Sequence, residues 1–155
     1  KETIELAFLI AEQLKQLHLH VQELSQGLES RISLGIAAEL DHTPFLAAVR
    51  ALMTHPAFTL RNPNRARSLV AMFCVNNPVQ FHAPDGSGYA FWAEQVIALD
   101  ALNPQVASRL ARAMDRWRRY APSLQWQMRE ALQKVAGQVK LSNDVREIVG
   151  KALAN

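Results

Sequence analysis

The chain has 155 residues, of which 49% are hydrophobic and 20% charged, and its formal net charge is +3. This composition is that of a folded globular domain and excludes disorder over most of the length. No apolar run approaches the roughly 20 residues that a membrane-spanning helix needs, so we expect no membrane partner. With 14 acidic residues against 17 basic ones, we also expect no nucleic-acid partner. The single cysteine, Cys74, excludes an internal disulfide and predicts a cytoplasmic location.

Apolar residues recur every three or four positions in residues 2–25, a spacing that predicts an amphipathic helix. Later helices are indicated by asparagine–proline pairs, whose asparagine oxygen can cap free amides. Proline suits the first helical position because its missing N–H would have no partner there. Such pairs occur at 62–63, 77–78 and 103–104, and Thr43-Pro44 and Ser142 are similar signals. The expected helices cover residues 2–25, 30–40, 44–54, 63–76, 88–101, 104–120, 122–136 and 143–153.

Strand signals are almost absent from the sequence, and the connections between the expected helices are short. Short connections place successive helices antiparallel, and helices in paired succession favour stacking into a solenoid. We therefore predict an all-α fold, with residues 1–155 forming a single helical domain. The domain would be an α-solenoid, a superhelical array of about eight antiparallel helices like those of ARM or HEAT repeats. Its core is expected to hold the tryptophans Trp92, Trp117 and Trp126.

Residues 82–88 form the one conspicuous loop. The Pro-Asp-Gly sequence within it is typical of a turn, because proline fixes φ and glycine accepts a positive φ. His82, Asp85 and Ser87 are the residue types of a catalytic triad, and Ser87 can also cap the helix that follows. Three neighbours in one short loop offer neither an oriented base nor an oxyanion hole. We therefore interpret His82 and Asp85 as residues that hold the loop by hydrogen bonds.

The sequence contains no H-E-x-x-H motif, which is the zinc-binding signature of many metallopeptidases. His18 and His20 are two positions apart on a predicted helix, so they point roughly 200° away from each other and cannot bind one ion. Cys74 follows Met72 and Phe73 in an apolar stretch, which predicts a buried and unreactive thiol. The sequence therefore predicts no catalytic residue and no metal ligand in this chain.

The expected helix over residues 104–120 carries a stripe of arginines. Positions i, i+3, i+7 and i+10 share one face of a helix. One interpretation is a solvated basic face. The other is a surface that recognises anions, because guanidinium groups bind carboxylates through two parallel hydrogen bonds. Arg65 and Arg67 on an earlier helix could add to it. The stripe consists of Arg109, Arg112, Arg116 and Arg119.

Several long motifs follow one another over the last two thirds of the chain. They are N-P-N-R-A-R-S-L at 62–69, F-H-A-P-D-G-S-G-Y at 81–89, L-D at 99–100, N-P-Q-V-A-S-R-L at 103–110 and W-R-R-Y at 117–120. On these motifs, residues 49–154 resemble the C-terminal helical domain of the bacterial aminopeptidase N family, of the gluzincin zinc metallopeptidases. Residues 46–155 form the similar part, whereas residues 1–45 are expected helices without a recognisable counterpart in the family. Ala121 and Leu124 depart from the family's usual capping and charged residues.

The resemblance implies a non-catalytic domain of a zinc-dependent aminopeptidase, an enzyme that removes N-terminal amino acids from peptides. The domain would close the catalytic chamber and help to gate or orient the peptide substrate. Zinc would be held by the catalytic domain of the same polypeptide, and this segment would hold no cofactor. By similarity, Arg67 and Arg109 would bind the peptide. Since the chain begins with Lys1, we expect it to belong to a longer polypeptide. The alternative is a stand-alone helical-repeat interaction module that uses its arginine-rich face.

Overall fold

The computed structural model describes residues 12, 13, 15 and 43–155. The chain divides into two compact units, Lys1–Phe58 and Thr59–Asn155, and each is described by itself. Every regular element in the described part of the chain is helical, which confirms the all-α prediction. None of the helices among the described residues is long and apolar enough to cross a membrane.

In the first unit, helix α2 spans Thr43–Met53 and agrees with the helix predicted over 44–54. Phe45, Leu46 and Val49 are its buried apolar side chains, at the three-to-four spacing of one helix face. The helices predicted over 2–25 and 30–40 lie almost entirely outside the described residues. The same is true of the histidine pair for which metal binding was considered, His18 and His20.

The second unit begins with a helical segment over residues 63–76 and continues through the four longer helices α6, α7, α8 and α9. The first segment contains a π-helical turn, η2, and the region after α7 contains two 3₁₀ turns, η3 and η4. The elements in chain order are α3 (Pro63–Ala66), η2 (Arg67–Ala71), α4 (Met72–Asn76), α5 (Pro78–Phe81), α6 (Ser87–Leu102), α7 (Pro104–Ala111), η3 (Arg112–Met114), η4 (Trp117–Arg119), α8 (Pro122–Ala136) and α9 (Asn143–Ala154).

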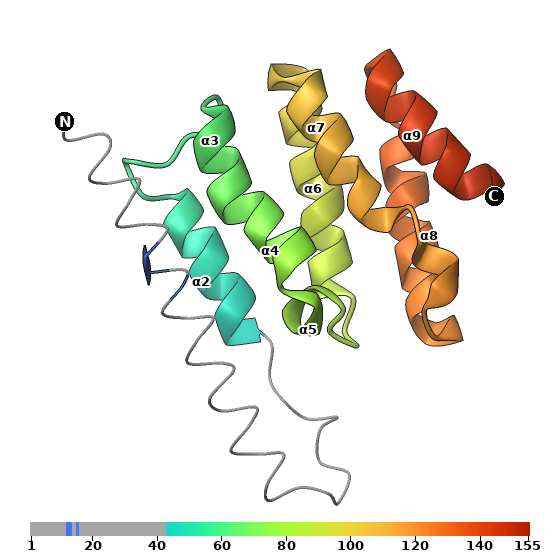
Figure 1. Cartoon of the computed structure of the whole chain (residues 1–155), viewed down its shortest axis with the longest axis horizontal. Helices are drawn as coiled ribbons and strands as arrows, with labels where there is room; N and C mark the ends of the chain where they lie inside the picture. Colours follow the sequence, from blue (N-terminus) through green and yellow to red (C-terminus); the bar gives the residue numbers. More distant parts are fainter. Residues whose placement is uncertain (1–11, 14, 16–42) are drawn as a thin grey trace, which may run out of the picture. The chain divides into compact units, whose positions relative to one another are not determined.

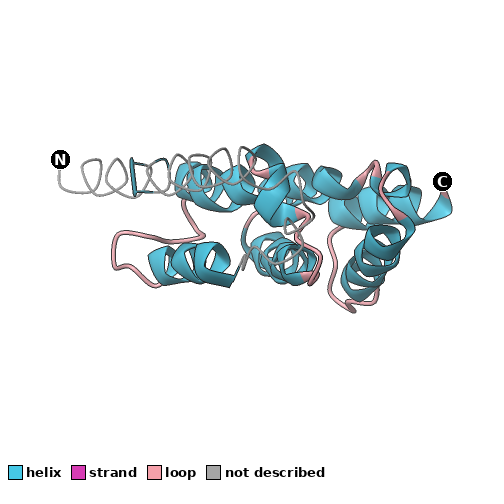
Figure 2. Ribbon diagram, turned by 90° about the horizontal axis from the view of Figure 1, so that it is seen from below, coloured by secondary structure: helices cyan, strands magenta, loops and turns pink. Residues whose placement is uncertain are grey.

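The longer helices of this unit form two stacked hairpins (Figure 1). Helix α6 packs on α7 and helix α8 packs on α9, so each pair is an antiparallel hairpin. The hairpins then stack with α6 against α8 and α7 against α9. The helices of the second unit therefore lie in two layers, as Figure 2 shows. This arrangement agrees with the predicted array of repeats.

The predicted capping residues start these helices. Asn62 Oδ1 accepts from the Asn64 N–H at 3.0 Å, and Asn103 Oδ1 accepts from the Val106 N–H at 3.3 Å. Ser142 Oγ caps α9 in the same way. Asn77 also caps a helix, but the four-residue α5 that it starts was not among the predicted helices. Local capping chemistry therefore fixed most of the helix starts.

The helix predicted over 104–120 is shorter than the sequence indicated. Helix α7 ends at Ala111, and Arg116 leaves the helical conformation with φ −106° and ψ 24°. This break lets the buried Trp117 donate from Nε1 to the Ala152 carbonyl at 2.8 Å. Arg118 donates to the same carbonyl and to that of Leu153, at 3.0 and 3.1 Å. Tertiary bonds to the end of α9 thus override the local helical preference.

The tryptophans follow the core prediction in two cases of three. Trp92 is fully buried in α6, and its Nε1 donates to the Leu110 carbonyl at 2.9 Å. Trp117 is buried against α9 through the bond described above. Trp126 is 66% exposed on α8, so its assignment to the core was wrong. It lies off the face that α8 buries, which consists of Met128, Ala131, Leu132 and Val135.

The loop before α6 is held by its own side chains, as predicted. Asp85 Oδ1 accepts from the Ser87 N–H at 2.9 Å and from the Ser87 hydroxyl at 2.6 Å. Asp85 therefore supplies the capping oxygen that had been assigned to Ser87. His82 Nδ1 lies 2.7 Å from the Tyr89 hydroxyl, and its ring stacks on Tyr120. Gly86 adopts a positive φ of 75°, the conformation that the Pro-Asp-Gly turn requires.

We expect His82 to make the folded chain less stable as the pH falls. Burial lowers the pKa of His82 below its ordinary value of 6.5. The unfolded chain therefore takes up the proton first, and stability is lost as the pH falls from 6.5 towards the lowered pKa. The melting temperature should drop between about pH 7.5 and about pH 5.5, and the drop should be smaller in His82→Gln. Equal drops in His82→Gln and in the unaltered chain would contradict this assignment.

Candidate functional site: a basic pocket beside the π turn

Arg67 is positioned by a local irregularity in its helix. It begins the π-helical turn Arg67–Ala71, in which the Met72 N–H donates to the Arg67 carbonyl. Such turns are rare and are often found at functional sites. The guanidinium donates from Nη2 to Asn64 Oδ1 at 2.7 Å and from Nε to the Pro63 carbonyl at 3.3 Å. Both acceptors are uncharged, so these bonds orient the group without neutralising its positive charge.

Arg109 comes from the last turn of α7, on a different helical hairpin. Its side chain is exposed, and it has no hydrogen-bond or ion-pair partner among the described residues. A guanidinium presents five N–H donors in a planar fork. Arg109 therefore offers its full donor set to a ligand, whereas Arg67 has already committed part of its own.

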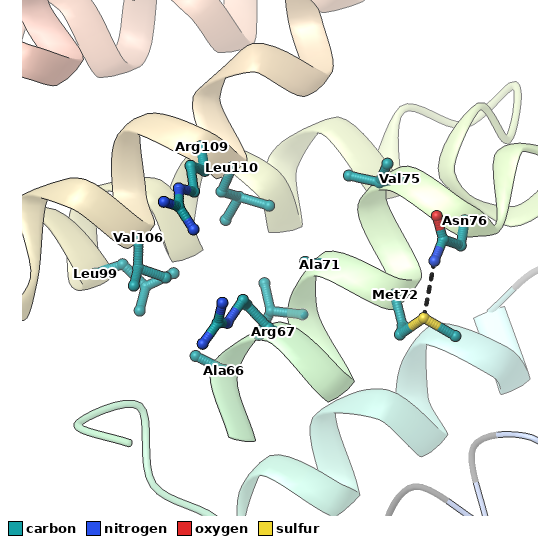
Figure 3. Close-up of a pocket in the computed structure, with 11 residues that line it drawn as sticks. Ala66, Arg67, Ala71, Met72, Val75, Asn76, Leu99, Val106, Arg109 and Leu110 are labelled. Carbon is teal, nitrogen blue, oxygen red and sulfur yellow. Dashed lines mark hydrogen bonds between the residues drawn. The ribbon is translucent and has the colours of Figure 1, made fainter. Parts of the chain in front are cut away.

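The structure brings Arg67 and Arg109 together in one pocket of about 240 Å³. Figure 3 shows the two guanidinium groups on the same side of this pocket, one from each helix. The pocket lies between the segment 66–76 and the two helices of the first hairpin, since Leu99 of α6 also lines it. The two residues singled out by similarity are thus neighbours in space.

The floor of this basic pocket is apolar and buried. Val70, Leu99 and Leu110 line it with relative exposures of 0%, 1% and 3%. Met72 and Val75 line its open side and are 44% and 56% exposed. A mostly apolar pocket with a few polar groups is the usual form of a small-ligand site.

The charge of the basic pocket is of one sign. Its lining contains two arginines and no aspartate or glutamate among the described residues. The Asn76 amide, the remaining polar side chain, donates to the Met72 sulfur at 2.9 Å, as Figure 3 shows. An anion placed between the two guanidinium groups would relieve their mutual repulsion and accept hydrogen bonds from both.

The predicted arginine stripe does not exist as one helix face, because α7 ends before most of its members. Arg112 lies in η3, 3.8 Å from Asp115. Arg116 lies in the irregular turn, and Arg119 ends η4. The neighbouring Arg118 lies over the Trp117 ring and donates to carbonyls of α9. The prediction of a continuous stripe was therefore wrong.

A second pocket, of about 410 Å³, lies between α7 and α9 and is polar. Its charges are largely compensated: Lys151 Nζ donates to Glu147 Oε1 at 2.6 Å, and Arg112 lies near Asp115. The hydrogen bond from Lys151 lowers the pKa of the Glu147 carboxyl. The second pocket therefore carries charges of both signs, whereas the charged side chains that line the basic pocket are both positive.

The described residues show neither a reactive cysteine nor a metal centre. Cys74 is buried, and burial raises the pKa of its thiol, as expected for an unreactive cysteine. Within the described ranges, no group of three or more histidine, cysteine, aspartate or glutamate side chains is placed to hold a metal ion. The basic pocket can therefore bind and orient a ligand, but it offers no group that would cleave one.

Sequence reasoning missed the apolar floor of the basic pocket. A signal was present, because each arginine has apolar neighbours three or four positions away on its own helix. Val70 and Ala71 follow Arg67 at these spacings, and Val106 precedes Arg109 by three. Residues so spaced lie on one helix face, so an arginine among them combines charge with an apolar surface.

The antiparallel helix hairpins stack so that their helices form two layers, and this arrangement defines the chain as a helical-repeat protein of the ARM type. A family model described as a domain of unknown function (DUF3458_C) with ARM repeats matches residues 32–154. The chain belongs to this family. The match begins upstream of residue 49, where the motif resemblance starts.

The relatives found by sequence are aminopeptidases, which confirms the resemblance described above. The chain is 49% identical to aminopeptidase N of Escherichia coli K12 over 109 residues, which are 70% of this chain and 12% of that protein. It is 45% identical to aminopeptidase N of Caulobacter vibrioides over 108 residues, with the same coverage. Among solved structures, Legionella pneumophila aminopeptidase A in complex with aspartic acid matches with a TM-score of 0.70 and 30% identity, covering 93% of this chain and 18% of that one. The chain thus spans about an eighth of its curated relatives.

Proposed function

We propose that this chain is the non-catalytic C-terminal domain of a zinc-dependent aminopeptidase that removes N-terminal amino acids from peptides. The family match and the aminopeptidase relatives support the parent activity. The 155 residues contain no H-E-x-x-H motif, so zinc and the catalytic groups would belong to another part of the polypeptide. The catalytic domain of that polypeptide is accordingly the expected partner, and the enzyme would act in the cytoplasm.

The domain would close the catalytic chamber and orient the peptide through the basic pocket. The observation that carries this role is the convergence of Arg67 and Arg109, from separate helices, on one pocket without an acidic side chain. A peptide substrate always carries a carboxylate at its far end unless that end is blocked. Two guanidinium groups can bind such a carboxylate and hold the peptide in register with a distant metal site.

If zinc and the catalytic groups belong to another part of the polypeptide, the isolated chain should hydrolyse no peptide, with or without added zinc. The full-length polypeptide that contains it should release amino acids from the N-terminus of a peptide. Liquid chromatography of the products measures both activities. Hydrolysis by the purified chain at a rate comparable with that of the full-length enzyme would contradict the proposal.

The arginine role predicts a loss that depends on the substrate's C-terminus. In the full-length enzyme, Arg67→Ala and Arg109→Ala should each lower kcat/KM for Ala-Ala-Leu by about tenfold, because one charge-assisted hydrogen bond at an exposed site is lost. The C-terminal amide of the same peptide should be cleaved equally well by the variants and the parent. The matched control is Arg129→Ala, an exposed arginine that lines neither pocket. Equal losses on acid and amide would exclude carboxylate recognition.

The alternative of a stand-alone interaction module rested on an arginine-rich helix face. The irregular turn after α7 divides that face, and Arg112 and Arg118 are engaged with other groups. The stripe of arginines on which this alternative relied is therefore not one continuous helix face in the described part of the chain.

A further inference from the structure

We propose that the basic pocket is a subsite for the C-terminal residue of a peptide, and that it selects an aliphatic side chain at that position. The side chain would enter the apolar floor while the carboxylate meets Arg67 and Arg109. This inference rests on the proposed function. It adds a specificity that carboxylate binding alone does not give.

The size of the pocket limits how much of a ligand it can hold. Its volume of about 240 Å³ lies below the roughly 300–1,000 Å³ of sites that enclose a drug-sized ligand. The pocket is therefore suited to one residue and not to a folded peptide. A peptide whose last residue occupies it would leave the remaining residues free to extend towards the catalytic domain.

The floor determines which residue fits. Val70, Leu99 and Leu110 present buried methyl groups. No polar side chain among the described residues lies on this floor, so a charged or amide side chain entering it would lose its hydration without a partner. An aliphatic side chain would instead displace water from the accessible apolar surface of the pocket, which Met72, Val75 and Val106 supply above this floor. The difference between leucine and glycine in such a pocket is on the order of tenfold or more in affinity.

The rim determines which end of the peptide binds. Arg67 and Arg109 are the charged groups in the described lining, and both are positive. The N-terminal amine of a peptide would be repelled there, whereas the C-terminal carboxylate would be attracted. Arg67 is already oriented by Asn64 and Pro63, which reduces the entropy lost when it binds.

The test titrates the unaltered chain with three small molecules, each of which mimics the C-terminal residue of a peptide. N-acetyl-L-leucine carries the side chain and the carboxylate, N-acetylglycine lacks the side chain, and N-acetyl-L-leucinamide lacks the charge. Titrations followed by NMR of the valine and leucine methyl groups measure the three dissociation constants. We expect N-acetyl-L-leucine to bind about tenfold more tightly than either of the other two, with shifts at Val70, Leu99 and Val106.

A pair of valine variants tests the location of binding. Val106 lines the basic pocket and is half-buried. The larger side chain of Val106→Phe should fill the space and lower the affinity for N-acetyl-L-leucine by about tenfold. Val139 is 92% exposed and lies outside both pockets, so Val139→Phe should leave the affinity unchanged. If Val106→Phe does not fold, the methyl shifts of the unaltered chain still decide the site.

The outcomes separate this inference from the proposed function. Equal binding of N-acetyl-L-leucine and N-acetylglycine, both lost in Arg67→Ala, would overturn the side-chain subsite and leave carboxylate recognition intact. Equal binding of N-acetyl-L-leucine and its amide would overturn the role of the arginines. Inorganic phosphate binding as tightly as N-acetyl-L-leucine would reduce the pocket to a general anion site and also overturn the inference.

Discussion

Replacing Gly88 with alanine is expected to destabilise the chain by about 3 kcal/mol, which lowers the melting temperature by about 10 °C. Gly88 lies buried in the first turn of α6 with an ordinary helical conformation, so no positive φ explains the glycine. A Cβ at this position would lie 2.1 Å from the Phe81 carbonyl oxygen. Because the obstacle is backbone, the helix α5 and the start of α6 would have to separate. Thermal unfolding followed by circular dichroism measures the loss.

Gly150 provides the matched control for this substitution. It lies exposed in α9, and a Cβ there would meet nothing within 4 Å. Gly150→Ala should therefore stabilise the chain by about 0.5–1 kcal/mol through helix propensity alone. A Gly88→Ala variant as stable as Gly150→Ala would show that the contact between α5 and α6 is not close in solution.

Removal of the Asp100 carboxylate should cost about 2 kcal/mol, measured by urea unfolding. Asp100 is 6% exposed near the end of α6. It accepts a hydrogen bond from the Ser142 N–H at 2.7 Å and another from the Ser142 hydroxyl. The same hydroxyl oxygen accepts from the Val145 N–H, so Asp100 secures the residue that caps α9. In Asp100→Ala, the Ser142 donors lose their partner and the start of α9 is held less tightly.

Asp144 separates this effect from simple charge near a helix start. It is an exposed acidic residue in the first turn of α9, where it gains only the attraction of the helix dipole. Asp144→Ala should cost about 0.5 kcal/mol. Were the two alanine variants equally stable, the bonds from Asp100 to Ser142 would not anchor the helix.

The sequence predicted correctly the helices whose ends are set by residues close by in the chain. The helix over 122–136 matches α8 at both ends, and the helix over 143–153 differs from α9 by one residue. Capping by Ser142 and proline at the first position are local effects, so a single sequence contains them. Ala121 stands where the family usually has a capping residue, and in the structure no side chain caps the start of α8.

The end of α7 could not be predicted in this way. Its cause is the bonding of Trp117 and Arg118 to carbonyls 34 and 35 residues further along the chain. No local pattern contains such a contact. The same limit applied to the basic pocket: Arg67 and Arg109 were singled out by resemblance, whereas their common pocket and its buried floor depend on how three helical segments pack.

The π turn also decides where the cysteine lies. In an uninterrupted α-helix, the face of Arg67 would recur seven positions later, at Cys74. The extra residue shifts the phase by about 100°, so Val75 lines the pocket and Cys74 points into the core. If the same residues formed an uninterrupted α-helix, the Cys74 thiol would instead lie beside two guanidinium groups, where thiolates form readily. The wide turn thus keeps the Cys74 thiol out of the basic pocket.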